Sequence, residues 1–445
     1  MTVSYPGDPG YDEATQVFNL IAPAKPAAAV TARTVDEVRA ALRHAAEESL
    51  PVRVHTTGHA SAAVRPVDGS LLVRTRIEGE VQIDTERRIA RVPAGTTWGA
   101  VVTAAARHGL AAPHGSAGTV GVVGYLLRGG MSFYGRDVGL AVNSVRAIEL
   151  VTADGELRRV SADQDQELFW ALRGGGGGFG VVTAIEVALF PASQVVTGVT
   201  FWPAAYAPEL LSTWLRWCAD APAAATTSIR VMNLPPLPDL PPELTAGPVF
   251  GVDGAVRCAD GDVAAGELIA AELLEPLRAI AAPVSDSWRP APTSAVLEVH
   301  MDPDEPLPVV GEHMLLGDLG DEGAAEFLRV VGAGSGSPFV VAGLRQLGGR
   351  YAEPDPAGGV LNHLTASYAY AGSGLAATPE QAHRLRAHCD VVRTALTPWD
   401  TGRTVPCFVE RFEQPQGHLS DVDIQAVDRV RARVDPTGRF SGDVA

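Results

Sequence analysis

Two glycine-rich segments constrain this chain more than any other feature of its sequence. One begins with five consecutive glycines at 174–178, and the other spans 114–140 and carries almost no charge. Ordering a glycine costs up to about 1 kcal/mol more than ordering an alanine, so dense runs need a reason. A mobile surface loop is one reason. The other is a ligand that the backbone approaches closely, because successive N–H groups can form a nest for a pyrophosphate.

The run that begins with five glycines also matches the GxGxxG spacing of a Rossmann dinucleotide site, through Gly175, Gly177 and Gly180. In that fingerprint the glycines follow a strand and open a helix whose N-terminus holds the pyrophosphate. Here the order is reversed, because the helical segment ELFWALR precedes the glycines and the strand-like segment VVTAIEVAL follows them. No acidic residue suited to a ribose occurs at the usual distance beyond them. A Rossmann fold is therefore disfavoured.

Length and composition indicate a globular protein of two or three domains. Of 445 residues, 46% are hydrophobic and 20% are charged. The net charge of −17 disfavours nucleic acid or an anionic membrane as a partner. No apolar stretch approaches about 20 residues and the N-terminus lacks a secretory pattern, so we expect a cytoplasmic protein without a membrane span. Scattered free thiols are then the expectation, although the cysteines could also form two disulfides (Cys218, Cys258, Cys389 and Cys407).

The arrangement of predicted elements divides the chain into three parts. Up to about residue 195, strands alternate with helices, including a helix within 31–50 that begins after Thr34 and a hairpin around Asp154-Gly155. From 196 to 400 the sequence mixes helices and strands with a proline-rich segment at 233–244, which we expect to be an irregular loop. The last part, 401–445, is too short to form its own core and is expected to dock on the first.

A histidine stands in a turn of small residues directly after a predicted strand, in the segment VRVHTTGHASAAVR at 52–65. Taken alone, His59 is most simply a polar surface residue. Three separated segments nevertheless share the same small, glycine-containing character, around 55–61, 115–125 and 174–182. They are predicted to form the walls of one large cofactor site.

These segments resemble the berberine bridge enzyme-like FAD-linked oxidases, within the vanillyl-alcohol oxidase and p-cresol methylhydroxylase (PCMH)-type flavoproteins. VHTTGHAS resembles the phosphate-binding loop of that family, and HGSAGTVGVVGYLLRGG resembles its second flavin segment. ELFWALRGGGGGFGVVTAIEVALFP carries the most specific similarity, with LRQLGG, VLNHLTASY and VDPTGRF extending it towards the C-terminus. The resemblance implies an α+β two-domain flavoprotein. A PCMH-type FAD-binding domain would be joined to an α/β substrate domain with an antiparallel sheet.

The resemblance also implies FAD as the cofactor, bonded through the ring of His59 to the methyl group on the benzenoid edge of the flavin. Many relatives carry a second bond through a cysteine, but that position here is Ala117, so a single histidyl attachment is expected. The predicted cofactor-binding residues are Thr56, Thr57, Gly58, His59, Ala60, Ser61, Ser116, Ala117, Gly118, Val120, Gly121, Gly124, Tyr125, Gly180, Val181 and Val182.

Oxidation by a flavin usually needs a base that takes a proton from the substrate. Many relatives use a tyrosine in a Tyr-any-Asn pattern, whereas this chain has Val405 and Cys407 at those positions. The predicted substitutes are Tyr134, His363, Tyr368, Tyr370 and Glu410. Each also has a structural interpretation: aromatic packing for the tyrosines, a hydrogen-bonded histidine, and a solvated or salt-bridged carboxylate. Tyr368 and Tyr370 alternate on one predicted strand, so both could face the substrate.

The predicted activity is oxidation of a small organic molecule with molecular oxygen as electron acceptor. Two alternatives remain open. One is a flavin-dependent dehydrogenase, or a tailoring cyclase or oxygenase of secondary metabolism; the other is a flavin-retaining binding protein with degenerate redox chemistry. No metal site is predicted, because the histidines are scattered. Abundant alanine, arginine in preference to lysine and few methionines are typical of a high-GC bacterial source.

Overall fold

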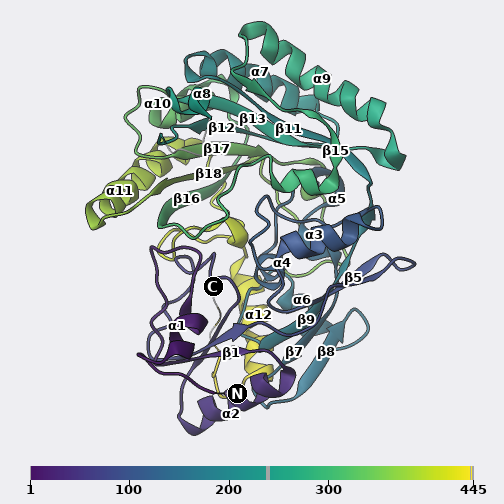
Figure 1. Cartoon of the computed structure of the whole chain (residues 1–445), viewed down its shortest axis with the longest axis vertical. Coiled ribbons are helices and arrows are strands. Elements are labelled where there is room, and N and C mark those ends of the chain that lie inside the picture. The colour runs from purple at the N-terminus through teal and green to yellow at the C-terminus, as the bar shows by residue number, and fades with distance from the viewer. Residues whose placement is uncertain (1, 237–240, 441, 443–445) are drawn as a thin grey trace.

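The computed structural model describes residues 2–236, 241–440 and 442 of the chain. Figure 1 shows a large sheet with helices above it and smaller sheets below it. The C-terminal segment, drawn in yellow, runs from the large sheet down into the lower half. The molecule therefore consists of an upper and a lower half, and the end of the chain connects them.

The N-terminal part of the lower half is a parallel sheet with the strand order β1-β3-β2. Helix α2 (Val35–Glu47) follows the first strand, and the side chain of Thr34 accepts a hydrogen bond from the Glu37 N–H at 3.2 Å, as a helix cap does. Helix α1 (Pro9–Thr15) packs on the same sheet. The strands are β1 (Ala28–Ala32), β2 (Val52–His55) and β3 (Leu71–Thr75).

The second sheet of the lower half is antiparallel, with the strand order β4-β5-β9-β7-β8. The predicted Asp154-Gly155 hairpin is confirmed, because it joins β7 to β8 and Gly155 takes the positive φ of +82° that this turn requires. Helix α6 (Gln166–Leu172) precedes the five glycines and β9 follows them, which confirms the order of helix, glycines and strand predicted from the sequence. The strands are β4 (Gln82–Asp84), β5 (Ile89–Pro93), β7 (Val145–Val151), β8 (Leu157–Ser161) and β9 (Val181–Ala188).

Helices pack between this sheet and the rest of the molecule. Together with the sheet they bury one apolar core around Trp98, Leu126 and Ile185. A short strand pair, β6 with β10, lies at its margin. The elements are α3 (Trp98–Ala106), α4 (Val122–Leu127), α5 (Gly135–Val138), α6 (Gln166–Leu172), β6 (Leu110–Ala111) and β10 (Phe190–Pro191).

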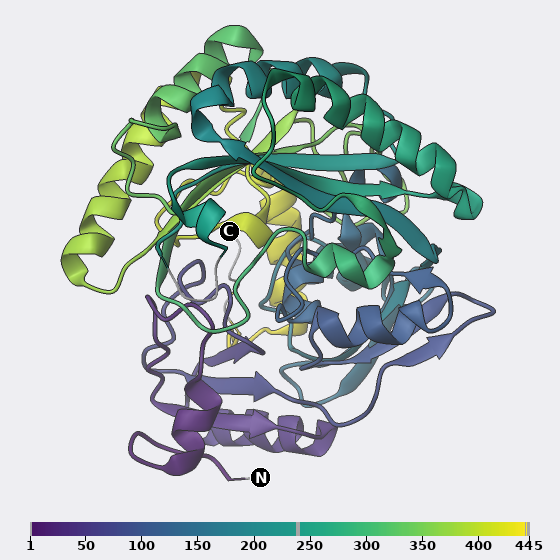
Figure 2. The ribbon, with the colours of Figure 1, turned by 45° about the horizontal axis from the view of Figure 1, so that its top comes forward.

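The upper half is an antiparallel sheet with the strand order β14-β11-β13-β12-β17-β18-β16, and β15 also pairs with β11. Figure 2 shows long helices covering the outer face of this sheet. An antiparallel sheet with helices behind it is what the sequence predicted. The strands are β11 (Gln194–Pro203), β12 (Ala225–Met232), β13 (Val249–Arg257), β14 (Ser285–Asp286), β15 (Arg289–Pro292), β16 (Val309–Leu316), β17 (Val341–Gln346) and β18 (Tyr368–Leu375).

Five helices in the described part of the upper half alternate with its strands along the chain, in keeping with the mixture of helices and strands expected for 196–400. They are α7 (Ala207–Asp220), α8 (Pro242–Thr245), α9 (Val263–Ile280), α10 (Gly320–Val331) and α11 (Pro379–Leu396). The proline-rich segment predicted to be a loop lies partly outside the described residues, and its end forms the short helix α8. The sheet begins at Gln194, close to the predicted boundary at 195, but the domain limits themselves stay predictions.

The two faces of the large sheet differ in chemical character. Ile229, Leu344 and Tyr370 belong to the apolar core beneath the helices. Side chains alternate along a strand, so the intervening residues point to the opposite face, towards the lower half. On this inner face the register places Asp253, Ser228 and Arg345 side by side on β13, β12 and β17.

The C-terminal segment returns to the lower half. Helix α12 (Asp421–Val434) begins after Ser420, which caps the Asp423 N–H at 3.2 Å, and it packs against α6. Further on, the Val52 N–H donates to the Arg439 carbonyl at 2.8 Å, and Phe440 joins the core of the parallel sheet. The last segment thus docks on the first part of the chain.

The start of this return is hydrogen-bonded to both halves. The Val405 N–H donates to His313 Nε2 on β16 at 3.1 Å. The Pro406 carbonyl accepts two hydrogen bonds from the Arg128 guanidinium, at 3.0 and 2.7 Å, next to helix α4. His313 and Arg128 therefore hold one short stretch of chain between the upper and lower halves.

Two further properties concern the surface and the thiols. Among the described residues, no helix combines the length and the apolar character that crossing a bilayer requires. The cysteines at 218, 258, 389 and 407 are free thiols, and the first three are buried.

We predict that acid destabilises the protein from about pH 6.5 downward. His313 is fully buried and doubly hydrogen-bonded as the neutral ring, and burial lowers its pKa to about 4. An unfolded histidine, with a pKa of about 6.5, binds the proton more readily. The unfolded state therefore gains protons first, and stability falls between pH 6.5 and 4. Thermal unfolding from pH 7.5 to 5.0 measures the slope.

The variant His313→Asn should have a shallower pH dependence of its unfolding temperature than the wild type. His108→Asn, which changes an exposed histidine after α3, is the control and should leave the slope unchanged. Equal slopes in His313→Asn and wild type would show that this ring is not the titrating group.

Candidate functional site

A cavity of about 920 Å³ lies between the lower half and the inner face of the large sheet. Its walls come from the loop after β2, the glycine-rich segment before and within α4, the glycines before β9, the sheet itself and the C-terminal return. This volume is near the upper end of the range for small-molecule sites, so it can hold a large cofactor.

The first wall is the turn that carries His59. Its ring stacks on Phe18, with centroids 3.8 Å apart and planes 15° from parallel. Burial lowers the pKa of His59 to about 4, so the ring is neutral at pH 7. Its Nε2 is buried and has no hydrogen-bond partner. A neutral imidazole with a free nitrogen is thus held at the cavity wall.

Gly58 explains how the turn reaches this position. Its φ is +71°, and a Cβ there would lie 2.7 Å from the backbone of Val17. The turn can therefore pass close to Val17 only if position 58 has no side chain. This close approach determines the position of the His59 backbone at the cavity wall.

The second wall is the segment from Gly115 to Tyr125. A Cβ on Gly121 would meet Thr56 at 3.2 Å, so this glycine lets the first two walls approach each other. A Cβ on Gly124 would meet no atom within 4 Å, although this residue lines the cavity. The missing side chain at 124 therefore leaves space for a ligand. The Tyr125 hydroxyl is buried without a hydrogen-bond partner.

The third wall is the glycine run before β9. Arg431 of α12 donates to the carbonyls of Gly175 at 2.6 Å and Gly177 at 3.2 Å, and its guanidinium lies 5.1 Å from the Phe179 ring. Gly178 has a φ of +96°. The run is therefore an ordered cradle held from behind by α12, and this geometry argues against the alternative of a mobile surface loop.

The roof of the cavity is the inner face of the large sheet. Asp253 is fully buried and pairs with Arg230 at 2.6 Å and with His300 Nδ1 at 2.9 Å, and it accepts a hydrogen bond from the Ser228 hydroxyl. Although burial acts to raise it, Arg230 and the hydrogen bonds hold the pKa of Asp253 below its ordinary value. Arg230 and His300 both line the cavity.

The C-terminal return supplies the last wall. Glu410 lines the cavity, and burial raises its pKa to about 7, against the opposing charge of Arg128. Cys407 and Phe408 lie on the same wall. Val405, the position where the family resemblance implied a tyrosine, is fully buried and packs in an apolar cluster.

Most predicted cofactor-binding residues meet at this cavity. Gly118 and Val181 do not line it: Gly118 packs against Gly99, and Val181 joins the core of the parallel sheet. The residues that line it are Thr56, Thr57, Gly58, His59, Ala60, Ser61, Ser116, Ala117, Val120, Gly121, Gly124, Tyr125, Gly180 and Val182.

Four of the five predicted catalytic candidates lie away from the cavity. Tyr134 is buried beside Phe190, with its hydroxyl 3.4 Å from the Thr293 carbonyl. Tyr368 and Tyr370 do share one face of β18, but it is the face beneath the helices. His363 lies in the loop before β18, with Nδ1 2.8 Å from the Asn362 side chain. Their catalytic roles stay predictions that this placement does not favour.

Several residues that line the cavity were not predicted as site residues, among them Phe18, Arg230, His300 and Arg345. Arg345 nevertheless lies in LRQLGG, one of the segments that carry the family resemblance. The arginine in the largely apolar predicted strand SPFVVAGLRQL is the one feature that could have pointed to a polar inner face.

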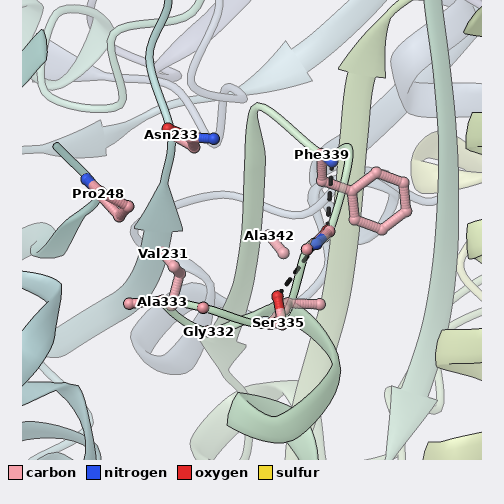
Figure 3. Close-up of a pocket in the computed structure, with 12 residues that line it drawn as sticks. Val231, Asn233, Pro248, Gly332, Ala333, Ser335, Phe339 and Ala342 are labelled. Atoms are coloured by element: carbon pink, nitrogen blue, oxygen red, sulfur yellow. Dashed lines mark hydrogen bonds between the residues drawn. The ribbon is translucent and has the colours of Figure 1, made fainter.

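A second, smaller hollow lies at the edge of the helix-covered face, near the loop after α10 (Figure 3). It measures about 250 Å³, and Ser335 and Ser337 hold its loop through hydrogen bonds to backbone N–H groups at 3.2 Å. Its described lining residues are apolar or neutral, so it offers no acid–base chemistry.

The large cavity fits FAD on three observations. Glycine backbone forms its walls, the open space beside Gly124 is not filled by protein, and the neutral ring of His59 presents a buried nitrogen with no partner. Residues 26–161 also match the protein family described as an FAD binding domain. This part of the chain is similar to that family.

Curated relatives align with only part of the chain. (R)-6-hydroxynicotine oxidase of Paenarthrobacter nicotinovorans is 34% identical over 203 residues. This alignment covers 45% of the present chain and 44% of the relative, so the chain matches less than half the length of that protein.

Solved structures match over nearly the whole chain. 6-Hydroxy-D-nicotine oxidase from Arthrobacter nicotinovorans has a TM-score of 0.83 at 21% identity, covering 100% of this chain and 97% of that one. Wild-type BBE-like 1 of Physcomitrella patens has a TM-score of 0.82 at 18% identity, covering 99% and 96%. At these identities the likeness establishes the fold. The predicted α+β two-domain flavoprotein fold, and the resemblance to the berberine bridge enzyme-like flavoproteins, are confirmed at this level.

We predict that Gly58→Ala lowers the FAD content of the purified protein severalfold. The added Cβ combines an unfavourable positive φ, about 1–2 kcal/mol, with a clash against Val17, so the turn must move. Gly69→Ala is the matched control, because its φ is +70° and nothing lies within 4 Å of the added Cβ. The ratio of flavin to protein absorbance measures the effect. Equal flavin contents in the two variants would show that the path of this turn does not determine binding.

Proposed function

We propose that this protein is an FAD-linked oxidoreductase that oxidises a small organic molecule, with molecular oxygen as electron acceptor. The observation that carries this proposal is the single cavity between glycine-lined walls that suit FAD and the polar inner face of a sheet that suits a substrate. The names of the relatives, which include oxidases and FAD-linked oxidoreductases, support an enzyme of this class.

His59 is the residue proposed to hold FAD covalently. Its ring is neutral, oriented by Phe18 and unpaired at Nε2, so it can form a bond without first losing a charge. This bond would replace a methyl C–H and the ring N–H with one C–N bond. The two protons and two electrons released would reduce one molecule of oxygen to hydrogen peroxide. Ala117 has no nucleophilic atom, so we propose one covalent link only.

When bound, FAD would accept a hydride from the substrate and pass the electrons to oxygen. The protein must then remove a proton from the substrate. Glu410 is proposed as this base, because it lines the cavity and its pKa of about 7 is close to the optimum for proton transfer at neutral pH. His300 is the other group suited to this step. The Nδ1–H of His300 donates a hydrogen bond to Asp253, which leaves Nε2 of His300 as the nitrogen that can accept a proton.

A second function within the flavin class is favoured by one specific observation. The positions of the usual Tyr-any-Asn base hold Val405 and Cys407, and Val405 is buried in an apolar cluster. This departure from the pattern makes a dehydrogenase, or a tailoring cyclase or oxygenase, the second candidate function. Hydrogen peroxide formed per substrate oxidised separates these activities: a ratio near one favours the oxidase. A flavin-retaining binding protein would produce none.

We predict that His59→Ala abolishes covalent attachment of flavin. In a denaturing gel, the wild-type band should show yellow fluorescence and the His59→Ala band should not. His55→Gln is the matched control, because His55 also lines the cavity but its Nε2 lies 2.8 Å from the Ala14 carbonyl. Covalent flavin in His59→Ala, or its loss in His55→Gln, would defeat the assignment.

We predict that the rate of flavin reduction rises with pH up to about 7 and then levels, because Glu410 acts as a base only when deprotonated. Glu410→Gln should slow reduction by about 10²–10⁴-fold and remove this pH dependence. His300→Gln should slow it less than Glu410→Gln. The substrate is first chosen by peroxide release across a panel of alcohols, amines and sugars, and stopped-flow absorbance then measures reduction. The reverse order of the two variants would assign the base to His300.

A further inference from the structure

Arg345 is a buried cation without a counter-ion. It lies on β17 at the inner face of the large sheet, lines the cavity and is only 4% exposed. Its Nε and Nη1 are buried and have no hydrogen-bond partner. Among the residues that the structure describes, no carboxylate forms an ion pair with it.

The aromatic neighbours of Arg345 do not replace that counter-ion. The guanidinium carbon lies 4.1 Å from the centroid of the Phe133 ring and 5.3 Å from that of Phe408. A cation–π contact supplies no hydrogen-bond acceptor to the N–H donors, which lie in the plane of the guanidinium. Because a guanidinium stays charged in proteins, it cannot relieve its burial by releasing a proton. The rings therefore orient the donors and leave them unsatisfied.

The nearby carboxylates are already committed elsewhere. Asp253 is the acidic residue in the same row of the sheet, but Ser228 stands between it and Arg345. Its oxygens are taken by Ser228, Arg230 and His300. Glu410, on the C-terminal return, has Arg128 as its neighbouring cation. Asp302 and Glu413 also line the cavity, but among the described residues neither forms an ion pair with Arg345. A bound molecule is then left to supply the anion.

We propose that Arg345 binds the carboxylate of the substrate, so that this enzyme acts on small organic acids with an apolar or aromatic body. The proposal rests on the function proposed above and adds the chemical class of the substrate. A planar guanidinium next to two aromatic rings suits a carboxylate, which can accept two parallel hydrogen bonds from its edge. Along the same wall the cavity is apolar at Met232, Val341 and Phe408, which suits the rest of such a molecule.

Benzoate and benzamide test this proposal, because they have nearly the same shape and only benzoate is charged. Each is titrated into the FAD-containing enzyme, and binding is followed by the change in visible flavin absorbance and by calorimetry. We expect the wild type to bind benzoate at least about 10-fold more tightly than benzamide. Arg345→Met, which keeps the length but removes the charge, should lose this preference. Arg345→Lys should keep part of it, as a charge without the paired donors.

A second measurement separates this role from a structural one. Removing an uncompensated buried charge should leave the unfolding temperature of ligand-free Arg345→Met equal to or higher than that of the wild type. Failure of this variant to fold, or a strongly lowered unfolding temperature, would instead make Arg345 part of the scaffold and overturn the proposal.

The flavin itself is the other possible source of negative charge, and its reduction potential distinguishes the two. If Arg345 instead pairs with the flavin, Arg345→Met should lower the reduction potential of the flavin in the ligand-free enzyme. The wild type should then bind benzoate and benzamide equally, and this result would overturn the proposal. Yellow, active protein that binds both probes equally would overturn this inference alone. Protein that never takes up FAD would overturn the proposed function as well.

Discussion

The hydrogen bonds of the C-terminal return tie the two halves of the molecule together at the wall of the cavity. Val405 and Pro406 bond to His313 above and Arg128 below, within neighbouring residues of one chain segment. Further along, Arg431 bonds to carbonyls of the glycine run. All these groups are buried or partly buried, so losing any one of them would leave an unpaired polar group. A short piece of chain thereby joins two large surfaces without filling the space between them.

Two buried carboxylates elsewhere in the upper half are paired with arginines. Glu312 is fully buried, and its two oxygens are taken by Arg393 and Arg411, the second of which belongs to the C-terminal return. Asp253 is satisfied by three neighbours. Such networks are costly unless every member is paired. Against this pattern, the unpaired guanidinium of Arg345 at the cavity stands out as a group kept for a ligand.

Local features of the fold could be predicted from the sequence because their causes are local. Thr34 caps a helix through its own side chain, and Asp154-Gly155 forms a hairpin because glycine accepts a positive φ. The glycine segments of the cavity walls were likewise predicted as a set. Tyr368 and Tyr370 show the limit of this reasoning. Alternation established that they share a face, but which face meets the helices depends on how the entire sheet packs, and the sequence of one strand does not contain that information.

The same limit explains why the polar roof of the cavity could not be predicted. Arg345 faces Ser228, and Ser228 faces Asp253, only because three strands far apart in sequence pair in one register. The consequence is thermodynamic as well as chemical. Several side chains that line the cavity keep buried polar atoms without partners, among them His59, Tyr125 and Arg345. Each lowers the stability of the ligand-free protein, and each regains a partner only if a ligand provides one. Binding would therefore raise the free energy of unfolding by giving these buried polar atoms partners at the interface between the two halves. Loss of the cofactor would then lower the stability of the protein.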